Sequence, residues 1–331
     1  MTVTVLNATS AENAWIDVVV ASKSPETTDI CRLELIDVGR CALPPFSAGA
    51  HILVEVRAGL SRSYSLYDLH EVSGGYRIAV LRDPTSRGGS AAVHDELQVG
   101  QHIRVSPPRN HFQLAECAPY SLLLAGGIGV TPILSMAAQL AAADQTFDMH
   151  YCARTRKSAA FVGRLEASPY KKRVQLHFDD GPPEQRLDID ATLATCPAGA
   201  HLYVCGPQGF INAVIARASA TGWSPERVHY ERFSADIASN EDDGSFEVEL
   251  ARSGKVVRIE KDKTVIEALA EAGMPLDTSC EQGICGVCIT QVLAGVPDHR
   301  DMYLSDEEKA RNDQFMPCCS RSLSSRLVLN I

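Results

Sequence analysis

Short segments in which apolar and polar residues alternate occupy the N-terminal third of the chain. His51–Val56 and Tyr76–Leu81 are two of these segments, and a Ser73-Gly74-Gly75 turn lies between two such runs. Regular short strands separated by Gly and Pro are typical of a small antiparallel barrel or sandwich. The pattern therefore predicts an all-β domain at the N-terminus.

The pattern changes near residue 113, where the apolar runs become continuous. They cover Tyr120–Ala125, a segment ending at Tyr151, Val174–Phe178 and His201–Cys205, and most are separated by helical stretches such as Pro132–Ala143. Alternating apolar strands and helices are the signature of a doubly wound parallel sheet. We expect an α/β domain here.

A third pattern begins after the polar, acidic segment Ala235–Gly244, which is typical of a linker. Phe246–Leu250 and Val256–Ile259 flank a turn and predict a hairpin. Thr264, with Glu267 three residues later, predicts a capping box at the start of a helix.

Composition narrows the possible functions. The chain has 331 residues, 45% of them hydrophobic and 22% charged, and a net charge of −10. Nucleic-acid binding needs clustered Lys and Arg, so we expect no nucleic-acid partner. No apolar stretch approaches the roughly 20 residues that span a bilayer, and the N-terminus lacks the pattern of a secretory signal. We expect a cytoplasmic protein without a membrane partner, and a monomer by default.

Five of the eleven cysteines lie between Cys280 and Cys319. Cys280, Cys285 and Cys288 have the spacing C-x4-C-x2-C, and Cys318-Cys319 follows about thirty positions later, which is the plant-type [2Fe–2S] pattern. Zinc also accepts four cysteines, but three in one loop are unusual for it. Adjacent side chains of an extended segment point in opposite directions, so only one of Cys318 and Cys319 is expected to be a ligand.

Two glycine-containing turns follow apolar strands. One contains Gly126, Gly127 and Gly129 before Thr131-Pro132, and the other is Cys205-Gly206-Pro207. Glycines let a strand-to-helix turn approach a pyrophosphate, and ligands bind beyond the carboxyl ends of parallel strands. We expect both turns at one nicotinamide site, with Cys205 near the nicotinamide. A plain strand-to-helix turn and a buried, inert Cys205 are the alternatives.

Basic residues follow the second strand of this domain, where an adenosine ribose would lie: Arg154, Arg156 and Lys157. An acidic residue there would favour NAD, whereas basic residues can accept a 2′-phosphate. The residues alone leave NADH, NADPH and a merely solvated basic turn open.

A second phosphate site is indicated in the N-terminal domain. Its candidate residues are Arg62, Ser63, Tyr64, Ser65, Arg82, Arg87, Gly88, Gly89 and Ser90. Arginines, glycine amides and a hydroxyl are the groups that a phosphate monoester needs. On its own, Arg62–Ser65 is only a polar strand.

Taken together, these motifs resemble the phthalate dioxygenase reductase and vanillate demethylase reductase family of the ferredoxin–NADP reductase superfamily. The resemblance covers nearly the whole chain through these segments: Ala48–His51, Arg62–Leu66, Arg87–Ser90, Ala125–Pro132, Cys205–Pro207, Glu231–Phe233, the cysteine cluster, Asp298–Asp301 and Cys318–Arg321.

The resemblance implies a six-stranded antiparallel FMN-binding β-barrel (residues 1–112), a doubly wound parallel NAD-binding domain (113–235), a linker (236–244) and a β-grasp ferredoxin domain (245–331). It implies FMN rather than FAD. It places Arg62 and Tyr64 on the flavin, Ser65 near flavin N5, and residues 88–90 at the phosphate.

The same resemblance places Thr131 between flavin and nicotinamide and makes Phe233 the aromatic ring that covers the flavin. It also makes Cys318 the fourth cluster ligand. Ser65, Thr131, Cys205 and Phe233 are therefore the expected catalytic residues. Most relatives use NADH, although Arg156 and Lys157 replace the acidic residue that some relatives carry.

These features predict an NADH-dependent reductase that passes hydride to FMN and single electrons through [2Fe–2S] to a Rieske-type terminal oxygenase in a transient complex. A haem monooxygenase, a separate ferredoxin or a quinone is an alternative acceptor. A cluster-based redox sensor is disfavoured because the chain has no basic helix and no spare domain, and a zinc-stabilised binding module ranks lower still.

Overall fold

The computed structural model describes residues 15–69, 74–84, 88–233, 243–278, 281, 283, 286–301 and 303–331. Ser73 of the predicted turn, Arg87, residues 235–242 of the predicted linker, Cys280 and Cys285 lie outside these residues. The chain forms two compact units. The first runs to Ala58 and from Arg62 to Arg232, and the second comprises Gly59–Ser61 and the residues from Phe233 onward.

The first unit contains the predicted all-β domain. Its six-stranded sheet has the order β4-β3-β6-β1-β2-β5, and antiparallel pairs join β1 to β2 and β6, β2 to β5, and β3 to β6. The elements are β1 (Ile16–Pro25), β2 (Ile30–Asp37), β3 (His51–Arg57), β4 (Leu60–Ser65), β5 (Tyr76–Leu81), α1 (Gly89–Asp95) and β6 (His102–Val105). The predicted strands at residues 51 and 76 are confirmed as β3 and β5.

The register of this sheet follows its hydrophobic alternation. Leu33 of β2 lies opposite Ile78 of β5, and both side chains are buried. Side chains alternate across a strand, so every second position points into the core.

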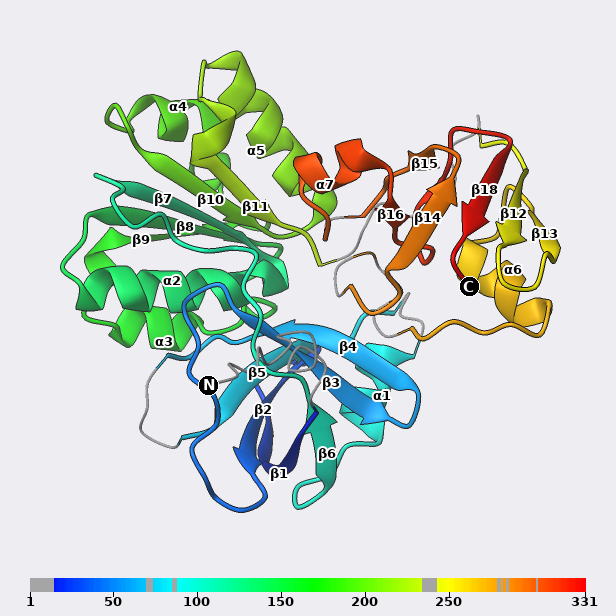
Figure 1. The fold of residues 1–331 in the computed structure, drawn as a ribbon. Coiled ribbons are helices and arrows are strands. Elements are labelled where there is room, and N and C mark those ends of the chain that lie inside the picture. Colours follow the sequence, from blue (N-terminus) through cyan, green and yellow to red (C-terminus); the bar gives the residue numbers. More distant parts are fainter. Residues whose placement is uncertain are drawn as a thin grey trace, which may run out of the picture. The chain divides into compact units, whose positions relative to one another are not determined.

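The first unit also contains a five-stranded parallel sheet of order β11-β10-β7-β8-β9. Its strands are β7 (Ser121–Gly126), β8 (Phe147–Ala153), β9 (Val174–Phe178), β10 (His201–Cys205) and β11 (Val228–Glu231). Its α-helices are α2 (Val130–Ala142), α3 (Val162–Ala167), α4 (Ile189–Ala194) and α5 (Gln208–Ala220). Helices α2 and α3 cover one face, and α4 and α5 cover the other (Figure 1), which confirms the predicted doubly wound fold.

The parallel strands are apolar because helices cover both of their faces. All six residues of β7 are buried. On one face, Leu122 and Leu124 of β7 pack with Leu202 and Val204 of β10 against Ile211 of α5. Continuous apolar runs are therefore expected for such strands, in contrast to the alternation in the first sheet.

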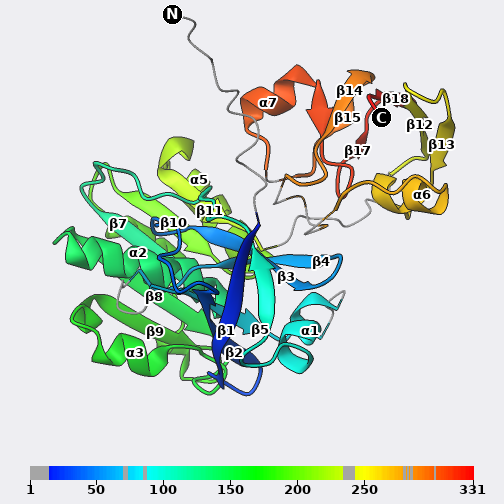
Figure 2. The ribbon, with the colours of Figure 1, turned by 60° about the horizontal axis from the view of Figure 1, so that its bottom comes forward.

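The second unit holds a mixed sheet of order β13-β12-β18-β14-β16 and a small pair of strands, β15 with β17. Its elements are β12 (Phe246–Leu250), β13 (Val256–Ile259), α6 (Val265–Glu271), β14 (Thr290–Ala294), β15 (Pro297–Asp298), α7 (Asp306–Arg311), β16 (Gln314–Phe315), β17 (Arg321–Ser322) and β18 (Arg326–Leu329). Helix α6 lies beside β12 and β13 (Figure 2). The predicted hairpin is antiparallel, and the capping box of Thr264 and Glu267 is present.

The end of the predicted linker is held within the second unit. The Arg300 guanidinium donates to Asp243, and Arg321 donates to the carbonyl of Gly244 at 3.0 Å. Asp243 and Gly244, the last two residues of the predicted linker, are thus held by hydrogen bonds within the second unit. The boundaries of the three domains predicted from the sequence stay a prediction.

Candidate functional site

Strand β4 carries the residues predicted to hold the flavin. The side chains of Arg62 and Ser65 are buried. The hydroxyl of Tyr64 is also buried and has no hydrogen-bond partner among the described residues, and burial raises its pKa. An unsatisfied buried hydroxyl costs about 1–3 kcal/mol, so this phenol is suited to a polar group of a bound ligand.

The predicted phosphate loop lies against the same strand. Gly88 has a left-handed backbone (φ 88°) at the start of α1. A Cβ on Gly89 would lie only 2.5 Å from Cγ of Arg62, so only glycine lets the Arg62 side chain pass this close. The residues present form a buried, basic, glycine-lined cradle that fits a flavin phosphate.

Two other members of the predicted phosphate site are already engaged. Arg82 forms a bidentate ion pair with Asp95 at 2.6 and 2.8 Å, and the hydroxyl of Ser90 accepts the Asp83 amide at 3.1 Å. Arg82 would therefore have to leave Asp95 to bind a phosphate.

The two glycine-containing turns meet at the carboxyl ends of β7 and β10. These strands are adjacent, with Ala125 opposite Cys205. A Cβ on Gly129 would lie 2.4 Å from the carbonyl of Cys205, and one on Gly126 would lie 2.8 Å from Pro207 Cδ. The glycines therefore permit a backbone contact that any side chain would block, and they bring both predicted turns to one place.

The start of α2 is held by a hydrogen bond within its own turn, and a second hydrogen bond joins the helix to the all-β domain. Thr131 is buried, and its hydroxyl donates to the Ile128 carbonyl at 3.0 Å, within the turn that contains Gly127. Pro132 occupies the first turn of the helix, where its missing N–H is tolerated. The amide of Gly49, just before β3, donates to Ser135 of α2 at 3.2 Å.

A buried polar cluster joins the flavin strand to the nicotinamide turns. Ser65 hydrogen-bonds the carboxyl of Glu231, which ends β11 and lies opposite Cys205 in the sheet. Burial raises the pKa of Glu231 to about 8 and raises that of the Cys205 thiol well above its ordinary value. His51 of β3 places Nδ1 3.9 Å from Oε1 of Glu231.

Glu231 and His51 lie in segments that carry the family resemblance, but the sequence indicated no role for either residue. A carboxyl at a strand end is a common sequence feature, and nothing local marks it as buried. The signal was its position at the end of a β-strand, two residues before Phe233. Phe233 itself is half-buried and belongs to the second unit, and its place over the flavin stays a prediction.

Glu166 neutralises part of the positive charge of the basic turn after β8. One guanidinium nitrogen of Arg156 donates to both carboxylate oxygens of Glu166 at 2.7 Å, and both side chains are about half exposed. Arg154 and Lys157 are exposed. Arg156 is thus less available to a 2′-phosphate than Arg154 and Lys157 are.

The cysteine site is built around two left-handed glycines. Cys288 and Cys318 are buried, and the amide of Gly283 (φ 68°) donates to Sγ of Cys318 at 3.3 Å. Hydrogen bonds from Cys288 and Cys319 lower the pKa of Cys318 below the ordinary value of a thiol. A Cβ on Gly286 would lie 2.3 Å from the Tyr303 ring. Thiolate ligands and amide donors in a tight glycine loop fit a [2Fe–2S] cluster.

The adjacent cysteines do not lie in an extended segment. Residues 317–319 form a turn in which the amides of Cys319 and Ser320 donate to the Met316 carbonyl. The segment is therefore not extended, and the rule that adjacent side chains of a strand point in opposite directions does not apply to it. Cys318 remains the predicted fourth ligand because it accepts the Gly283 amide.

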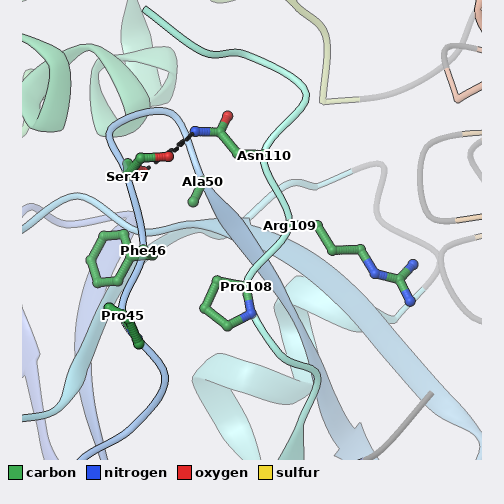
Figure 3. A pocket seen from close by; sticks show the side chains of 7 residues that line it. All are labelled: Pro45, Phe46, Ser47, Ala50, Pro108, Arg109 and Asn110. Atoms are coloured by element: carbon green, nitrogen blue, oxygen red, sulfur yellow. Dashed lines mark hydrogen bonds between the residues drawn. The ribbon is translucent and has the colours of Figure 1, made fainter. Parts of the chain in front are cut away.

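A separate cavity of about 350 Å³ lies in the first unit (Figure 3). The residues that line it are Pro45, Phe46, Ser47, Ala50, Pro108, Arg109 and Asn110. Asn110 donates to the Ser47 hydroxyl at 2.8 Å and holds the two loops together. None of the predicted cofactor residues lines this cavity.

Comparison with known proteins places these features in context. Residues 248–323 match the model of the 2Fe-2S iron-sulfur cluster binding domain, and residues 101–228 match that of the dimethylamine monooxygenase subunit DmmA-like N-terminal domain. A vanillate O-demethylase oxidoreductase of Pseudomonas sp. is 49% identical over 96% of this chain and 100% of its own length.

Two solved structures extend the comparison. One is phthalate dioxygenase reductase, described as a modular structure for electron transfer from pyridine nucleotides to [2Fe-2S]. It has a TM-score of 0.75 and 37% identity over 97% of this chain and 99% of its own. The other is an intact type IV self-sufficient cytochrome P450 monooxygenase, with a TM-score of 0.80 and 36% identity. This chain spans 43% of that protein.

Proposed function

Because the chain belongs to the family of vanillate O-demethylase oxidoreductase and phthalate dioxygenase reductase, we propose that it is the NADH-dependent reductase component of a Rieske-type oxygenase system. Electrons enter from NADH, pass through FMN and [2Fe–2S], and leave to the terminal oxygenase. We place the protein in the cytoplasm as a monomer that forms a transient complex with its oxygenase. No described helix is long and apolar enough to cross a membrane.

The observation that carries this proposal is the convergence of β4 with the glycine turns. Ser65, at the end of the flavin strand, touches Glu231, which lies beside Cys205 and the turn at Gly129. Hydride transfer needs the flavin and nicotinamide rings in contact. The two predicted cofactor sites are adjacent at this point.

The side chains have separate tasks in this arrangement. Arg62 and the glycines of residues 88–89 hold the flavin phosphate, and Tyr64 packs on the ring system. Flavin, when bound, supplies the conversion of a two-electron hydride into single electrons. The protein positions the cofactors and excludes water, and needs no nucleophile.

The cluster completes the route. Cys280, Cys285, Cys288 and Cys318 are the proposed ligands, and the amide of Gly283 tunes the potential by its hydrogen bond to Cys318. A thiolate cluster takes one electron at a time, so it matches an oxygenase that also accepts single electrons.

The first experiment is an anaerobic visible spectrum of the full chain before and after NADH. Flavin bands and a broad red-shifted cluster absorbance should both bleach. In Cys288→Ser the flavin bands should still bleach while reduction of a Rieske protein is lost. Full-rate reduction of the Rieske protein by this variant would contradict the route.

A haem protein is the second candidate acceptor. It is favoured by the structural match to one part of a self-sufficient cytochrome P450 chain. Comparing reduction rates of a purified Rieske oxygenase and a purified cytochrome P450 at equal concentration separates the two, since only the physiological partner should saturate at low concentration.

A further inference from the structure

The stoichiometry of the proposed route leaves one proton at the flavin site. NADH delivers one hydrogen nucleus with two electrons, and the [2Fe–2S] cluster accepts the electrons alone, one after the other. For each NADH oxidised to NAD⁺, one proton must therefore leave this site, where Ser65 and Glu231 have little contact with solvent. A path of titratable side chains from this region to solvent is needed.

We infer that His51 relays this proton from the buried Ser65–Glu231 pair to the surface beside His111. The inference rests on the proposed function, because it takes Ser65 to lie at the reacting end of the flavin. It assigns His51 a role in proton release and none in hydride transfer.

The first step of the path is the pair at the end of β4. Ser65 hydrogen-bonds Glu231, whose second carboxyl oxygen is buried without a partner among the described residues. Burial raises the pKa of Glu231 to about 8, so near neutral pH this carboxyl can both take up and release a proton. Cys205 beside it is unsuitable, since burial keeps its thiol protonated.

The second step is the gap between Glu231 and His51. Nδ1 of His51 lies 3.9 Å from Oε1 of Glu231 and is also buried without a hydrogen-bond partner among the described residues. A rotation of the carboxyl closes this distance to a hydrogen bond. Burial, together with His111 and Arg109 nearby, lowers the pKa of His51 to about 4. The ring is thus neutral at pH 7, the form that keeps one nitrogen free to accept a proton.

The third step reaches the surface. The ring of His111 lies 5.8 Å from that of His51, and His111 is exposed. Backbone hydrogen bonds of 2.8 and 2.9 Å between His51 and Arg109 hold this segment against β3. Arg109 and Ala50, on either side of the path, also line the cavity of about 350 Å³ in Figure 3, which offers water access to the outlet.

The groups that face His51 are Glu231 from β11, and His111 and Arg109 from the segment after β6. Arg109 is cationic and His111 is ionisable, so both disfavour a lasting positive charge on His51. A proton is therefore expected to pass through His51 and not to stay on it.

The test uses the full-length holoprotein with His51→Gln, which keeps a polar side chain but cannot relay, and with His51→Ala. Flavin bleaching by NADH in one anaerobic turnover should be unchanged in both. Steady reduction of an acceptor should fall about a hundredfold, the low end of the contribution of a proton-transfer group. Added imidazole should restore the rate of His51→Ala, and the solvent deuterium isotope effect should increase in His51→Gln.

A readout independent of turnover is the infrared carboxyl band of Glu231, identified by its loss in Glu231→Gln. After a pH jump this band should equilibrate more slowly in His51→Gln than in the native protein. His102→Ala, at an exposed histidine on β6, is the matched control and should change neither turnover nor the band.

Several results would overturn the relay. One is an unchanged turnover in His51→Gln. Another is a slow turnover of His51→Ala that imidazole does not restore, together with an unchanged pH-jump rate in His51→Gln. If both His51 variants fail to fold, His111→Gln at the exposed outlet should still slow turnover and be restored by imidazole, and full activity there would refute the path. Failure of the proposed function is distinguishable, because NADH would then not bleach the flavin bands of the native protein, whatever the His51 variants do.

Discussion

At Glu231 the proposed function and the stability of the fold have opposite requirements. One of its oxygens is buried without a partner among the described residues, and burial raises its pKa to about 8 from an ordinary value of 4.5. The folded state therefore keeps this proton while the unfolded chain releases it between pH 4.5 and 8. The stability of the first unit that depends on Glu231 is present at low pH and is lost as pH rises through this window.

Glu231→Gln should remove this loss. At pH 4.5 the variant and the native protein should melt alike, and by pH 8 the variant should be more stable by an amount on the order of a few kcal/mol. Calorimetric melting of the first unit across this range measures the difference. A difference independent of pH would show that Glu231 is ionised in the fold at neutral pH.

Gly129 gives a prediction with a matched control. Its Cβ would clash at 2.4 Å with the carbonyl of Cys205, whereas Gly209 in α5 has nothing within 4 Å. Gly129→Ala should destabilise the first unit by about 1–3 kcal/mol and raise the KM for NADH by separating the two turns. Gly209→Ala should stabilise by roughly 0.5–1 kcal/mol, because alanine favours helix. Melting curves and NADH titrations of both variants test this, and equal effects would remove the close contact as the cause.

At the scale of elements, Asp68 joins the two sheets of the first unit. It lies three residues after β4 and accepts from Arg77 of β5 at 2.7 Å and from Arg164 of α3 at 3.1 Å. Arg164 also lies 5.6 Å above the Tyr67 ring. This contact sets the flavin strand against the parallel sheet, so it bears on the distance between the two cofactors.

Asp68→Ala should cost about 3 kcal/mol, because it leaves two partly buried guanidinium groups without this carboxylate. Arg156→Ala removes an Arg–carboxylate ion pair that is half exposed, and should change stability by less than about 1 kcal/mol. Thermal melting of both variants makes the comparison. A similar cost for both would mean that Asp68 does not couple the sheets.

The elements themselves were largely predictable, because burial imposes a period on the sequence. The apolar runs that became β9 and β10 and the capped helix α6 follow from local rules. The features that escaped prediction depend on contacts between distant segments. The buried state of Glu231, the engagement of Arg82 by Asp95 and the turn at Cys318 cannot be read from neighbouring residues.

At the scale of the whole molecule, two compact units hold different cofactors and should lose stability separately. In the second unit, Cys288 and Cys318 pack with Ile266 of α6 and with Met316, so the cluster loop is part of that unit's apolar interior. The ion pair of Arg300 with Asp243 ties the start of the unit to a neighbouring loop. Loss of the cluster should thus lower the stability of the whole second unit and have little effect on the stability of the first.

Iron removal from the full chain by a chelator under reducing conditions should therefore lower one calorimetric transition and leave the other in place. A loss of about 2 kcal/mol would lower the melting temperature of a domain of roughly 100 residues by about 10 °C. Removal of FMN should do the reverse, shifting only the transition of the first unit, since ligand binding stabilises the unit that holds it. If either treatment shifts both transitions equally, the units are energetically coupled. Electron transfer between flavin and cluster would then be gated by one cooperative structure, whereas independent transitions leave each unit free to exchange electrons as a separate module.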